Sequence, residues 1–345
     1  MSHGKGTAFV ALSGGVDSSV AALLLVREGW DVTGVFMKPW QPRGMRCLWE
    51  ADRSDALRVA AFLDIPLETW DFSRQYGRLV SRPMLDAYRG GTTPNPDVEC
   101  NRHIKFGIFA DSAFSRGADI IATGHYARVG RSGGKPCLMA ARDRDKDQTY
   151  FLWGIREQTL ARTRFPVGHL LKSEVRAIAR RAGLVTALKR DSQGICFVGP
   201  LDVKDFLTRS IPSRRGTIVH TDGRVLGTHD GAAYYTIGQR HGLDIRDGGG
   251  PYFVVSKDMR RNRVTVGDER ALMTSAARIR DVHWIGGTRP SLTGLKAQIR
   301  YRSTPVASRL HGRTLQFSRP VRAVAPGQSV VFSAGNRILG GAILA

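Results

Sequence analysis

The glycine-rich stretch Ser13-Gly14-Gly15-Val16-Asp17-Ser18-Ser19 constrains this chain more than any other segment. It follows an apolar run, Thr7–Leu12, that predicts a buried strand, and it precedes Val20–Arg27, which predicts a helix. A glycine-rich turn between a parallel strand and a helix binds anions, because free N–H groups and the positive end of the helix dipole face the ligand. The sequence therefore predicts a phosphate site in this turn.

The side chains of this turn sharpen the prediction. Ser13, Ser18 and Ser19 add hydroxyl donors, whereas no lysine follows at the position that a Walker loop requires. Asp17 has the wrong charge to bind phosphate directly. It is interpreted either as an acid at the start of the helix or as a ligand of a magnesium ion on the phosphates. A purely structural turn of small residues is the alternative.

The N-terminal half alternates strands and helices, which predicts an α/β fold with a parallel sheet covered on both faces. Ligands of such sheets bind at the carboxyl ends of the strands, so the loops after Leu12, Met37 and Thr123 are expected to share one crevice. Met37 is placed against an adenine ring or, alternatively, in the core. The expected strands are Thr7–Leu12, Asp31–Met37, Leu67–Asp71 and Asp119–Thr123, and the expected helices are Ser18–Glu28, Ser54–Leu63, Phe72–Tyr88 with a break at Pro83, and Ile104–Arg116.

The later chain has a different character. A basic helix is expected from Lys172 to Ala182, ended by Gly183. We place a catalytic domain at 1–205, a small β-rich domain at 206–270 with a hairpin over 251–267, and a C-terminal barrel or sandwich at 271–345.

The net charge of +22 is large for 345 residues. Nucleic acid is the leading partner for such a chain, and a generally basic proteome is the alternative. Arg300, Tyr301 and Arg302 are interpreted as one RNA-facing patch, or as an edge strand kept soluble by charge. No run of 18 apolar residues and no signal sequence occurs, so a cytoplasmic protein without a membrane segment is expected.

Four cysteines do not predict a disulfide framework, and the absence of C-x-x-C gives no support to a metal site. Cys100 ends a loop stiffened by Pro94 and Pro96 just before a predicted helix, where the dipole favours a thiolate. Cys196 follows a glycine in a polar loop behind Lys189 and Arg190, whose charges lower a thiol pKa. The alternative for Cys100 is a capped turn with a buried cysteine, and core packing is the role expected for Cys47 and Cys137.

Several stretches together resemble one family, the tRNA-specific 2-thiouridylases of bacteria and mitochondria. Ser-Gly-Gly-Val-Asp-Ser-Ser is similar to the pyrophosphate loop of the wider ATP pyrophosphatase superfamily. More specific are the stretches Thr93–Asn101, Ala122–Arg128, Asp191–Phe197, Tyr235–Arg240 and Ala325–Ser329. The resemblance covers nearly the whole chain and implies a Rossmann-like pyrophosphate-loop domain, a central β-rich domain and a C-terminal β-barrel that contacts tRNA.

The resemblance also implies roles for individual residues. ATP and magnesium are assigned to Ala11, Leu12, Ser13, Gly14, Gly15, Val16, Asp17, Ser18, Met37 and Gly124. Contacts with tRNA are assigned to Asn95, Pro96 and Asp97 at the target base, and to His125, Lys146, Asp147, Gln148, Arg300, Tyr301 and Gln328. Cys196 is the implied persulfide carrier, Cys100 its nucleophilic partner, and Asp97 a general acid/base or base-orienting group.

The implied reaction adenylates O2 of the wobble uridine and then replaces it with sulfur. Either the Cys196 persulfide attacks C2 and leaves a Cys100–Cys196 disulfide, or Cys100 first releases hydrosulfide. The expected partners are tRNA and a cysteine desulfurase or sulfur-relay protein, with the enzyme itself a monomer. An amidotransferase-type adenylating enzyme and a catalytically silent RNA-binding protein are the rival functions.

Overall fold

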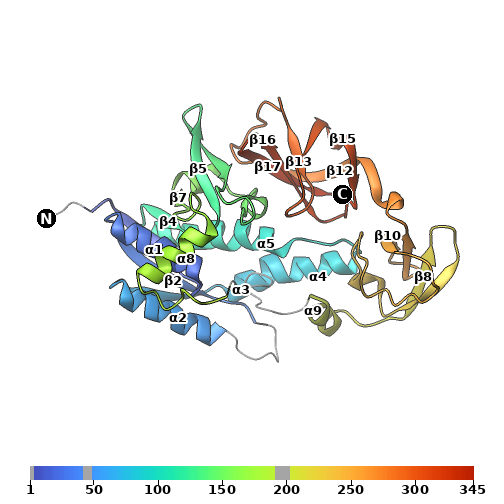
Figure 1. Cartoon of the computed structure of the whole chain (residues 1–345), viewed down its shortest axis with the longest axis horizontal. Helices are drawn as coiled ribbons and strands as arrows, with labels where there is room; N and C mark the ends of the chain where they lie inside the picture. The colour runs from blue at the N-terminus through green and yellow to red at the C-terminus, as the bar shows by residue number, and fades with distance from the viewer. Residues whose placement is uncertain (1–3, 42–48, 191–202) are drawn as a thin grey trace.

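A computed structural model describes residues 4–41, 49–190 and 203–345. Figure 1 shows a parallel-sheet region at the N-terminal end, a small β-rich region at the other end, and a C-terminal barrel packed over the middle. This order of architectures confirms the predicted fold class.

The N-terminal sheet is entirely parallel, with the strand order β3-β2-β1-β4-β7. Because β1 lies between β2 and β4, the chain leaves β1 at the point where the strand order reverses, which is where such sheets bind ligands. The strands are β1 (Thr7–Ala11), β2 (Asp31–Lys38), β3 (Leu67–Asp71), β4 (Ile120–Ala122) and β7 (Thr163–Arg164). The four predicted strands are therefore confirmed.

Helices cover both faces of this sheet, as predicted. Ala8 and Val10 of β1 pack in one core cluster with α1 (Val16–Arg27), α2 (Trp49–Phe62) and α8 (Lys172–Arg181). Phe9 and Ala11 pack in a second cluster with the helices between residues 73 and 115. Alternate residues of β1 thus feed two cores, which explains why the strand is apolar throughout. A further short helix, α7 (Glu157–Ala161), precedes β7.

Two helical runs differ from the prediction. The first continues through α3 (Ser73–Tyr76), the π-helical segment Gly77–Ser81 and α4 (Arg82–Arg89), so the break expected at Pro83 is wrong. The wide π turn ends at Ser81, so Pro83 falls in the first turn of α4, where its missing N–H is tolerated.

The second run begins earlier than expected. It comprises α5 (Pro96–Glu99), the π-helical segment Cys100–Phe109 and α6 (Ala110–Ser115), instead of starting at Ile104. Pro96 occupies the first helical turn, where a missing N–H costs nothing. Cys100 consequently lies within the helical run and not in the loop before it.

The central region is a four-stranded sheet of order β10-β11-β8-β9, preceded by α9 (Val203–Ser210). Antiparallel pairing of β10 with β11 confirms the predicted hairpin. Its core includes Met84 and Tyr88, which anchor it to α4. The strands are β8 (Gly216–His220), β9 (Val225–His229), β10 (Phe253–Asp258) and β11 (Arg263–Gly267).

The C-terminal barrel closes because β12 pairs with both β15 and β17. Its strands are β12 (Met273–Trp284), β13 (Lys296–Gln298), β14 (Val306–His311), β15 (Thr314–Arg322), β16 (Ser329–Ala334) and β17 (Arg337–Leu344). A hairpin from the N-terminal half, β5 (Ala127–Ser132) and β6 (Lys135–Ala140), extends the same sheet through β6 and β17. Sequence reasoning missed this hairpin, although its Gly133-Gly134 turn signals one.

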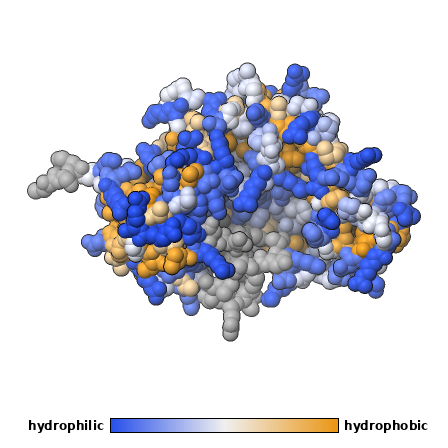
Figure 2. Space-filling model, in the orientation of Figure 1, coloured by the Kyte–Doolittle hydropathy of each residue, from blue (hydrophilic) through white to orange (hydrophobic). Residues whose placement is uncertain are grey.

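The remaining regular structure consists of short 3-10 turns at Thr149–Phe151, Ala232–Tyr234 and Arg270–Leu272. Within the three described ranges, every helix is too short or too polar to cross a bilayer. Hydrophilic side chains cover much of the face shown in Figure 2, with apolar side chains gathered in smaller areas between them.

Candidate active site

The glycine-rich loop is held by close contacts that only glycine permits. Gly14 has φ +73°, and a Cβ on it would lie 2.1 Å from the Asp52 carbonyl oxygen of α2. A Cβ on Gly124, just after β4, would lie 2.6 Å from the Ser18 amide nitrogen. The loops after β1 and β4 therefore touch at the carboxyl edge of the sheet, as the shared crevice requires.

The serine hydroxyls of this loop stabilise its backbone. Ser18 Oγ donates to the Gly15 carbonyl at 2.9 Å and accepts from the Ser13 amide at 3.2 Å. Ser19 Oγ also donates to the Gly15 carbonyl at 2.9 Å. Ser13 itself is exposed at the rim. The hydroxyls thus shape a turn at the N-terminus of α1, which begins directly after Gly15.

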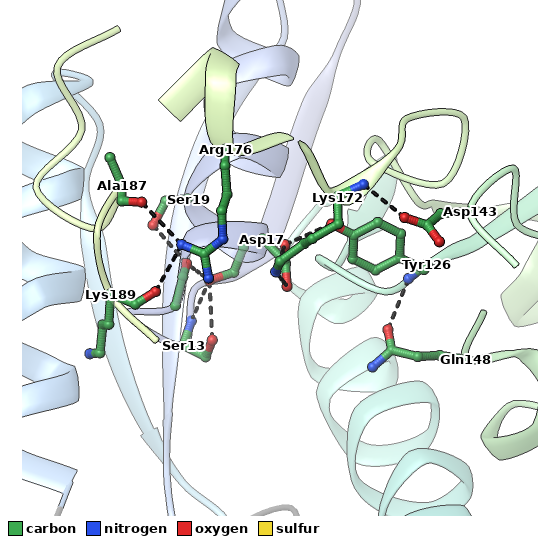
Figure 3. A network of polar contacts seen from close by, with 12 residues as sticks. Ser13, Asp17, Ser19, Tyr126, Asp143, Gln148, Lys172, Arg176, Ala187 and Lys189 are labelled. Carbon is green, nitrogen blue, oxygen red and sulfur yellow. Dashed lines mark hydrogen bonds and ion pairs between the residues drawn. The ribbon is translucent and has the colours of Figure 1, made fainter. Parts of the chain in front are cut away.

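Asp17 is the acid of the first turn of α1, and its carboxylate is fully engaged (Figure 3). Lys172 Nζ lies 2.7 Å and 2.8 Å from its two oxygens, and Tyr126 Oη donates to Oδ1 at 2.9 Å. The Lys172 side chain is only 12% exposed. Of the two interpretations given to Asp17, the helix-start acid agrees with this geometry, because both oxygens already have protein partners.

A second pair of contacts secures the loop from α2. Lys189 Nζ lies 2.7 Å from Asp52 Oδ1 and 2.6 Å from Asp55 Oδ2. Burial opposes the charge of Lys189, but the hydrogen bonds that its ammonium group donates to the two carboxylates outweigh this effect and raise the lysine pKa. Arg176 of α8 donates to the carbonyls of Ala187 and Lys189 at 3.1 Å and 3.0 Å (Figure 3). Lys189 thus links the segment after α8 to α2, the helix whose Asp52 carbonyl lies against Gly14.

Lys172 and Arg176 are residues whose place at this site the sequence did not reveal. Both were expected only within a basic helix. Their spacing of four residues puts both on one face of α8, which is a weak signal.

The proline loop presents the predicted thiol at the start of a helix. Asn95 caps the helix by accepting a hydrogen bond from the Val98 amide at 3.3 Å, and Pro96 and Asp97 form the first turn. Cys100 follows, with its thiol fully buried. It packs in the same cluster as Ala11, the last residue of β1. The thiol therefore belongs to the core on one face of the sheet, near the positive end of a helix.

The C-terminal barrel braces this loop. Gln328 Nε2 donates to the carbonyls of Thr93 and Pro94 at 2.8 Å and 3.2 Å, and the Thr93 amide donates to the Pro326 carbonyl at 2.8 Å. A Cβ on Gly327 would lie 2.9 Å from both the nitrogen and the oxygen of Thr93. The proline loop and the turn before β16, more than 230 residues apart in the sequence, thus meet in direct backbone contact.

The remaining assigned residues lie around this centre. Met37, the residue before the end of β2, is half-buried and packs against the core that contains Cys100, a position that fits either of its two predicted roles. His125 is buried beside Phe106 and Phe165, with Nδ1 2.8 Å from Thr123 Oγ1. Burial, assisted by the charge of Lys105, holds the His125 pKa well below its usual value.

Asp147 and Gln148 make backbone contacts within the catalytic domain. Asp147 Oδ2 accepts from the Ala141 amide at 2.6 Å, and Gln148 Oε1 accepts from the Tyr126 amide at 2.9 Å. The neighbouring Lys146 is half-buried, and its amide donates to Asp143. This segment is therefore an ordered turn held by side-chain contacts with backbone amides.

Arg300 and Tyr301 lie at the seam between the barrel and the other regions. Arg300 Nη2 donates to the carbonyls of Ile237 and Ala323 at 2.8 Å and 3.0 Å, and burial lowers the Arg300 pKa. The Tyr301 ring packs 4.5 Å from that of Phe151. Arg302 is exposed and lies over the Tyr301 ring.

Cys196 and Cys47 lie outside the described residues. Cys137 is buried in β6, in the packing position expected for it. Among the described residues, no three histidine, cysteine or acidic side chains gather where they could hold a metal ion.

Three family models match the chain consecutively. They are a tRNA methyl transferase HUP domain over residues 6–200, a tRNA methyl transferase PRC-barrel domain over 204–268 and an aminomethyltransferase beta-barrel domain over 274–344. A parallel sheet, a glycine-rich turn at a helix N-terminus and two β domains in this order define the chain as a pyrophosphate-loop enzyme of RNA modification.

Curated relatives give the particular family. The chain is 46% identical over 343 residues to tRNA-specific 2-thiouridylase MnmA 2 of Geobacillus kaustophilus, which covers 96% of this chain and 92% of the relative. It is 46% identical over 347 residues to tRNA-specific 2-thiouridylase MnmA of Bacillus subtilis, with coverage of 96% and 93%. The chain belongs to the tRNA-specific 2-thiouridylase family. Membership favours tRNA thiolation over the amidotransferase-type and silent RNA-binding alternatives.

Solved structures share only part of the architecture. An NMN synthetase from Francisella tularensis gives a TM-score of 0.34 with 16% identity, over 59% of this chain and 72% of that one. A 4-thiouridine synthetase in complex with RNA and ATP gives 0.39 with 18% identity, over 60% and 50%. The assignment to a family therefore rests on the sequence relatives.

Proposed function

We propose that this enzyme adenylates C2–O2 of the wobble uridine of tRNA with ATP and replaces the oxygen with sulfur from a cysteine persulfide. The observation that supports this most directly is the position of Cys100. A buried thiol in the early turns of a helix belongs to the same core cluster as Ala11, the last residue of β1, and the carboxyl end of β1 leads into the glycine-rich turn. A nucleotide and a sulfur nucleophile can therefore meet at one edge of the sheet.

The nucleotide is assigned to Ala11–Ser18, with Gly124 closing the turn. The fit is favourable, because a Cβ at Gly14 or Gly124 would fill the close-packed turn that backbone N–H groups line. Magnesium, when bound, neutralises phosphate charge, and its expected ligands are chiefly phosphate oxygens because Asp17 is paired with Lys172. The chain's own contribution is the helix N-terminus and the ammonium group behind it.

The sulfur step balances with two thiols. O2 of the uridine attacks the α-phosphorus of ATP, and pyrophosphate leaves. The terminal sulfur of a Cys196 persulfide attacks C2, the C2–O2 bond breaks, and AMP leaves. The Cys100 thiolate attacks the inner sulfur, so the S–S bond breaks, the transferred sulfur is reduced and a Cys100–Cys196 disulfide forms. A thiol reductant then restores both cysteines. In the alternative route, Cys100 attacks first and the released hydrosulfide attacks C2.

The target base must leave the anticodon stack to reach this edge. We assign its recognition to Asn95, Pro96 and Asp97, since they open the helix that carries Cys100. Asp97 orients the base or moves its proton. Contacts with the rest of the tRNA are assigned to His125, Lys146–Gln148, Arg300, Tyr301 and Gln328. A cysteine desulfurase or a sulfur-relay protein supplies the persulfide to a monomeric, cytoplasmic enzyme.

A labelling experiment tests this function. Unmodified tRNA, ATP, magnesium, a cysteine desulfurase and sulfur-labelled cysteine are incubated with the enzyme, and nucleosides are analysed by mass. Label in 2-thiouridine at the wobble position, with AMP and pyrophosphate as products, is the expected result. ATP cleavage without label in the tRNA, when an authentic thiouridylase labels the same tRNA, would overturn the proposed acceptor.

A further inference from the structure

A groove runs along the surface beside the carboxyl end of β2, with a volume of about 620 Å³. One wall is the chain that leaves β2, and the other is the helical run that starts at α3. We call it the arginine groove. Its lining residues are Lys38, Pro39, Trp40, Gln41, Ser73, Arg74, Gly77, Arg78 and Arg82.

Three arginines form one stripe along the helical wall. Arg74, Arg78 and Arg82 are spaced four residues apart, through α3, the π-helical segment and the start of α4. Residues at this spacing lie on one side of a helix, one per turn. All three are exposed and all three line the groove. The stripe therefore presents a row of guanidinium groups to whatever occupies the groove.

These charges are uncompensated in the described part of the chain. No carboxylate in residues 4–41, 49–190 or 203–345 forms an ion pair with Arg74, Arg78 or Arg82. By contrast, Arg89 on the next turns of the same run pairs with Asp86 at 3.0 Å, and exposed Arg116 pairs with Glu68. What distinguishes the groove is that three such arginines, unpaired within the described residues, follow one another along a single helical run.

The facing wall is held in place by its own contacts. The Trp40 ring stacks 5.8 Å from that of Tyr76 and meets Phe206 edge-on at 6.1 Å. Lys38 Nζ pairs with Asp71 Oδ2 at 2.9 Å, so this wall adds little net charge. Hydrogen bonds from Ser73 and Lys38 lower the Asp71 pKa to about 2, which keeps the pair ionised. The net positive charge of the groove consequently comes from the arginine stripe.

We propose that the arginine groove binds the phosphodiester backbone of the tRNA substrate, an inference that rests on the proposed function. Guanidinium groups match phosphate oxygens in pairs, and backbone contacts of this kind fix the position of a nucleic acid without reading its sequence. The excess of positive charge over the whole chain, +22, fits the same partner.

An acidic protein is the competing occupant, and the lining argues against it. Protein interfaces place large apolar side chains at their centre. The large apolar ring in the lining, Trp40, is half-buried and stacked on Tyr76, and none of the exposed large hydrophobic residues of the described chain, such as Leu57, lines the groove. The groove offers charge along its length instead, as a polyphosphate chain requires.

The position of the groove suits a substrate whose target base enters the crevice. Val35 of β2 pairs with Ala11 of β1, and Lys38 lies three residues further along β2, about 10 Å away at the rise of a strand. The groove thus begins beside the carboxyl edge where the nucleotide and Cys100 are proposed to act. Phosphates next to the wobble nucleotide are the part of the tRNA that reaches it.

The test compares tRNA binding by the wild type and by the double variant Arg74→Ala/Arg78→Ala over about 50 to 200 mM salt. Loss of two backbone contacts lowers the slope of log K against log salt by about 1.5, since each contact contributes about 0.7 to 0.9. Arg78→Lys keeps the charge and is expected to keep the slope. Arg27→Ala is the matched control, because Arg27 is equally exposed but ends α1 at the opposite edge of the sheet.

Two outcomes would overturn the inference. One is an unchanged affinity and salt slope in the double variant. The other is unchanged tRNA binding with a rate of thiolation that falls only when a desulfurase, and not inorganic sulfide, supplies the sulfur, because that result places a protein in the groove. If the slope falls but the wild type makes no 2-thiouridine, the groove still binds RNA and the proposed function fails separately.

Discussion

Lys172 reaches across 155 residues of sequence to place its ammonium group 2.7 Å from Asp17. The two side chains lie in the first turns of two different helices, α8 and α1, which pack side by side on one face of the sheet. Tyr126, from the segment after β4, contacts the same carboxylate. Three separate stretches of chain thus converge on the first turn after the glycine-rich loop and fix its direction.

Replacing Lys172 with methionine is expected to weaken ATP use about 10- to 100-fold in kcat/KM, the cost of one buried charge-assisted contact. The half-buried Asp17 carboxylate loses its counter-charge and repels the phosphates. Formation of AMP, measured against ATP concentration, tests this. Lys172→Arg, which keeps the charge, should recover most of the activity, and equal losses in both variants would contradict an electrostatic role.

Gly14→Ala is expected to abolish nucleotide binding. The new Cβ would lie 2.1 Å from the Asp52 carbonyl, and the residue has a positive φ. Gly29→Ala is the matched control, because Gly29 has φ +85° but nothing within 4 Å of the added atom. Both variants carry the backbone strain of about 1 kcal/mol or more, and only Gly14→Ala also displaces α2. Thermal unfolding without ATP measures the backbone strain, and the shift of the unfolding temperature on adding ATP measures nucleotide binding. Similar ATP-dependent shifts in both variants would refute the predicted loss of binding in Gly14→Ala.

Cys100→Ser and Cys196→Ser are each expected to abolish thiolation while leaving tRNA affinity within about twofold. The oxygen analogue cannot complete disulfide chemistry at neutral pH. Cys137→Ser serves as the control, since Cys137 is a buried free thiol of β6 with no assigned chemistry. Nucleoside analysis after a single turnover measures the loss. Thiolation at the wild-type rate by either variant would show that its thiol is not required.

Gln328→Ala is expected to lower the free energy of unfolding by about 1 to 3 kcal/mol even without tRNA. The substitution leaves the carbonyls of Thr93 and Pro94 without the donor that ties them to the barrel. Denaturant titration of the free enzyme tests this structural role, and tRNA affinity tests the assigned RNA contact. A variant with wild-type stability and weakened tRNA binding would show that Gln328 acts on the RNA alone.

The buried His125 is expected to make the fold sensitive to acid. Its pKa is depressed in the folded protein, so the unfolded chain binds the proton more readily and stability falls as the pH decreases below about 6.5. Above that pH, the imidazole is neutral in both states and contributes no slope. The loss is at most about 1.4 kcal/mol per pH unit. His125→Gln should flatten the dependence of unfolding free energy on pH between about 5 and 6.5, and an unchanged slope would exclude His125 as its source.

Many elements of this fold can be predicted from the sequence because the signals that specify them are local. The apolar run before Ser13, the glycines that follow it and the periodicity of α1 predict a strand, an anion-binding turn and a helix without further information. Asn95-Pro96 likewise marks the start of a helix, although the segment was predicted to start eight residues later at Ile104. The error arose because Asp97, Glu99 and Asn101 look like loop residues, whereas the cap and the first turn favour them.

The contacts that complete the site were beyond prediction because they join distant segments. Nothing near Lys172 in the sequence indicates Asp17, and nothing near Gln328 indicates Thr93. The resemblance assigned Arg300 and Gln328 to RNA, but it did not reveal that both also hold protein backbone. Such pairings depend on how the sheet and the barrel pack, which periodicity does not encode.

The hairpin of β5 and β6 has a consequence for the folding of the protein during its synthesis on the ribosome. Its second strand, β6, pairs with β5 on one side and with β17, the final strand of the chain, on the other. Roughly 200 residues separate β6 from β17, which at about 5 to 20 residues per second leaves an open strand edge waiting for tens of seconds. An edge of this kind pairs readily with other chains. The β6 edge is therefore covered only once β17 has been made. Loss of the residues from Arg337 onward should leave this edge unpaired and the truncated protein prone to self-association.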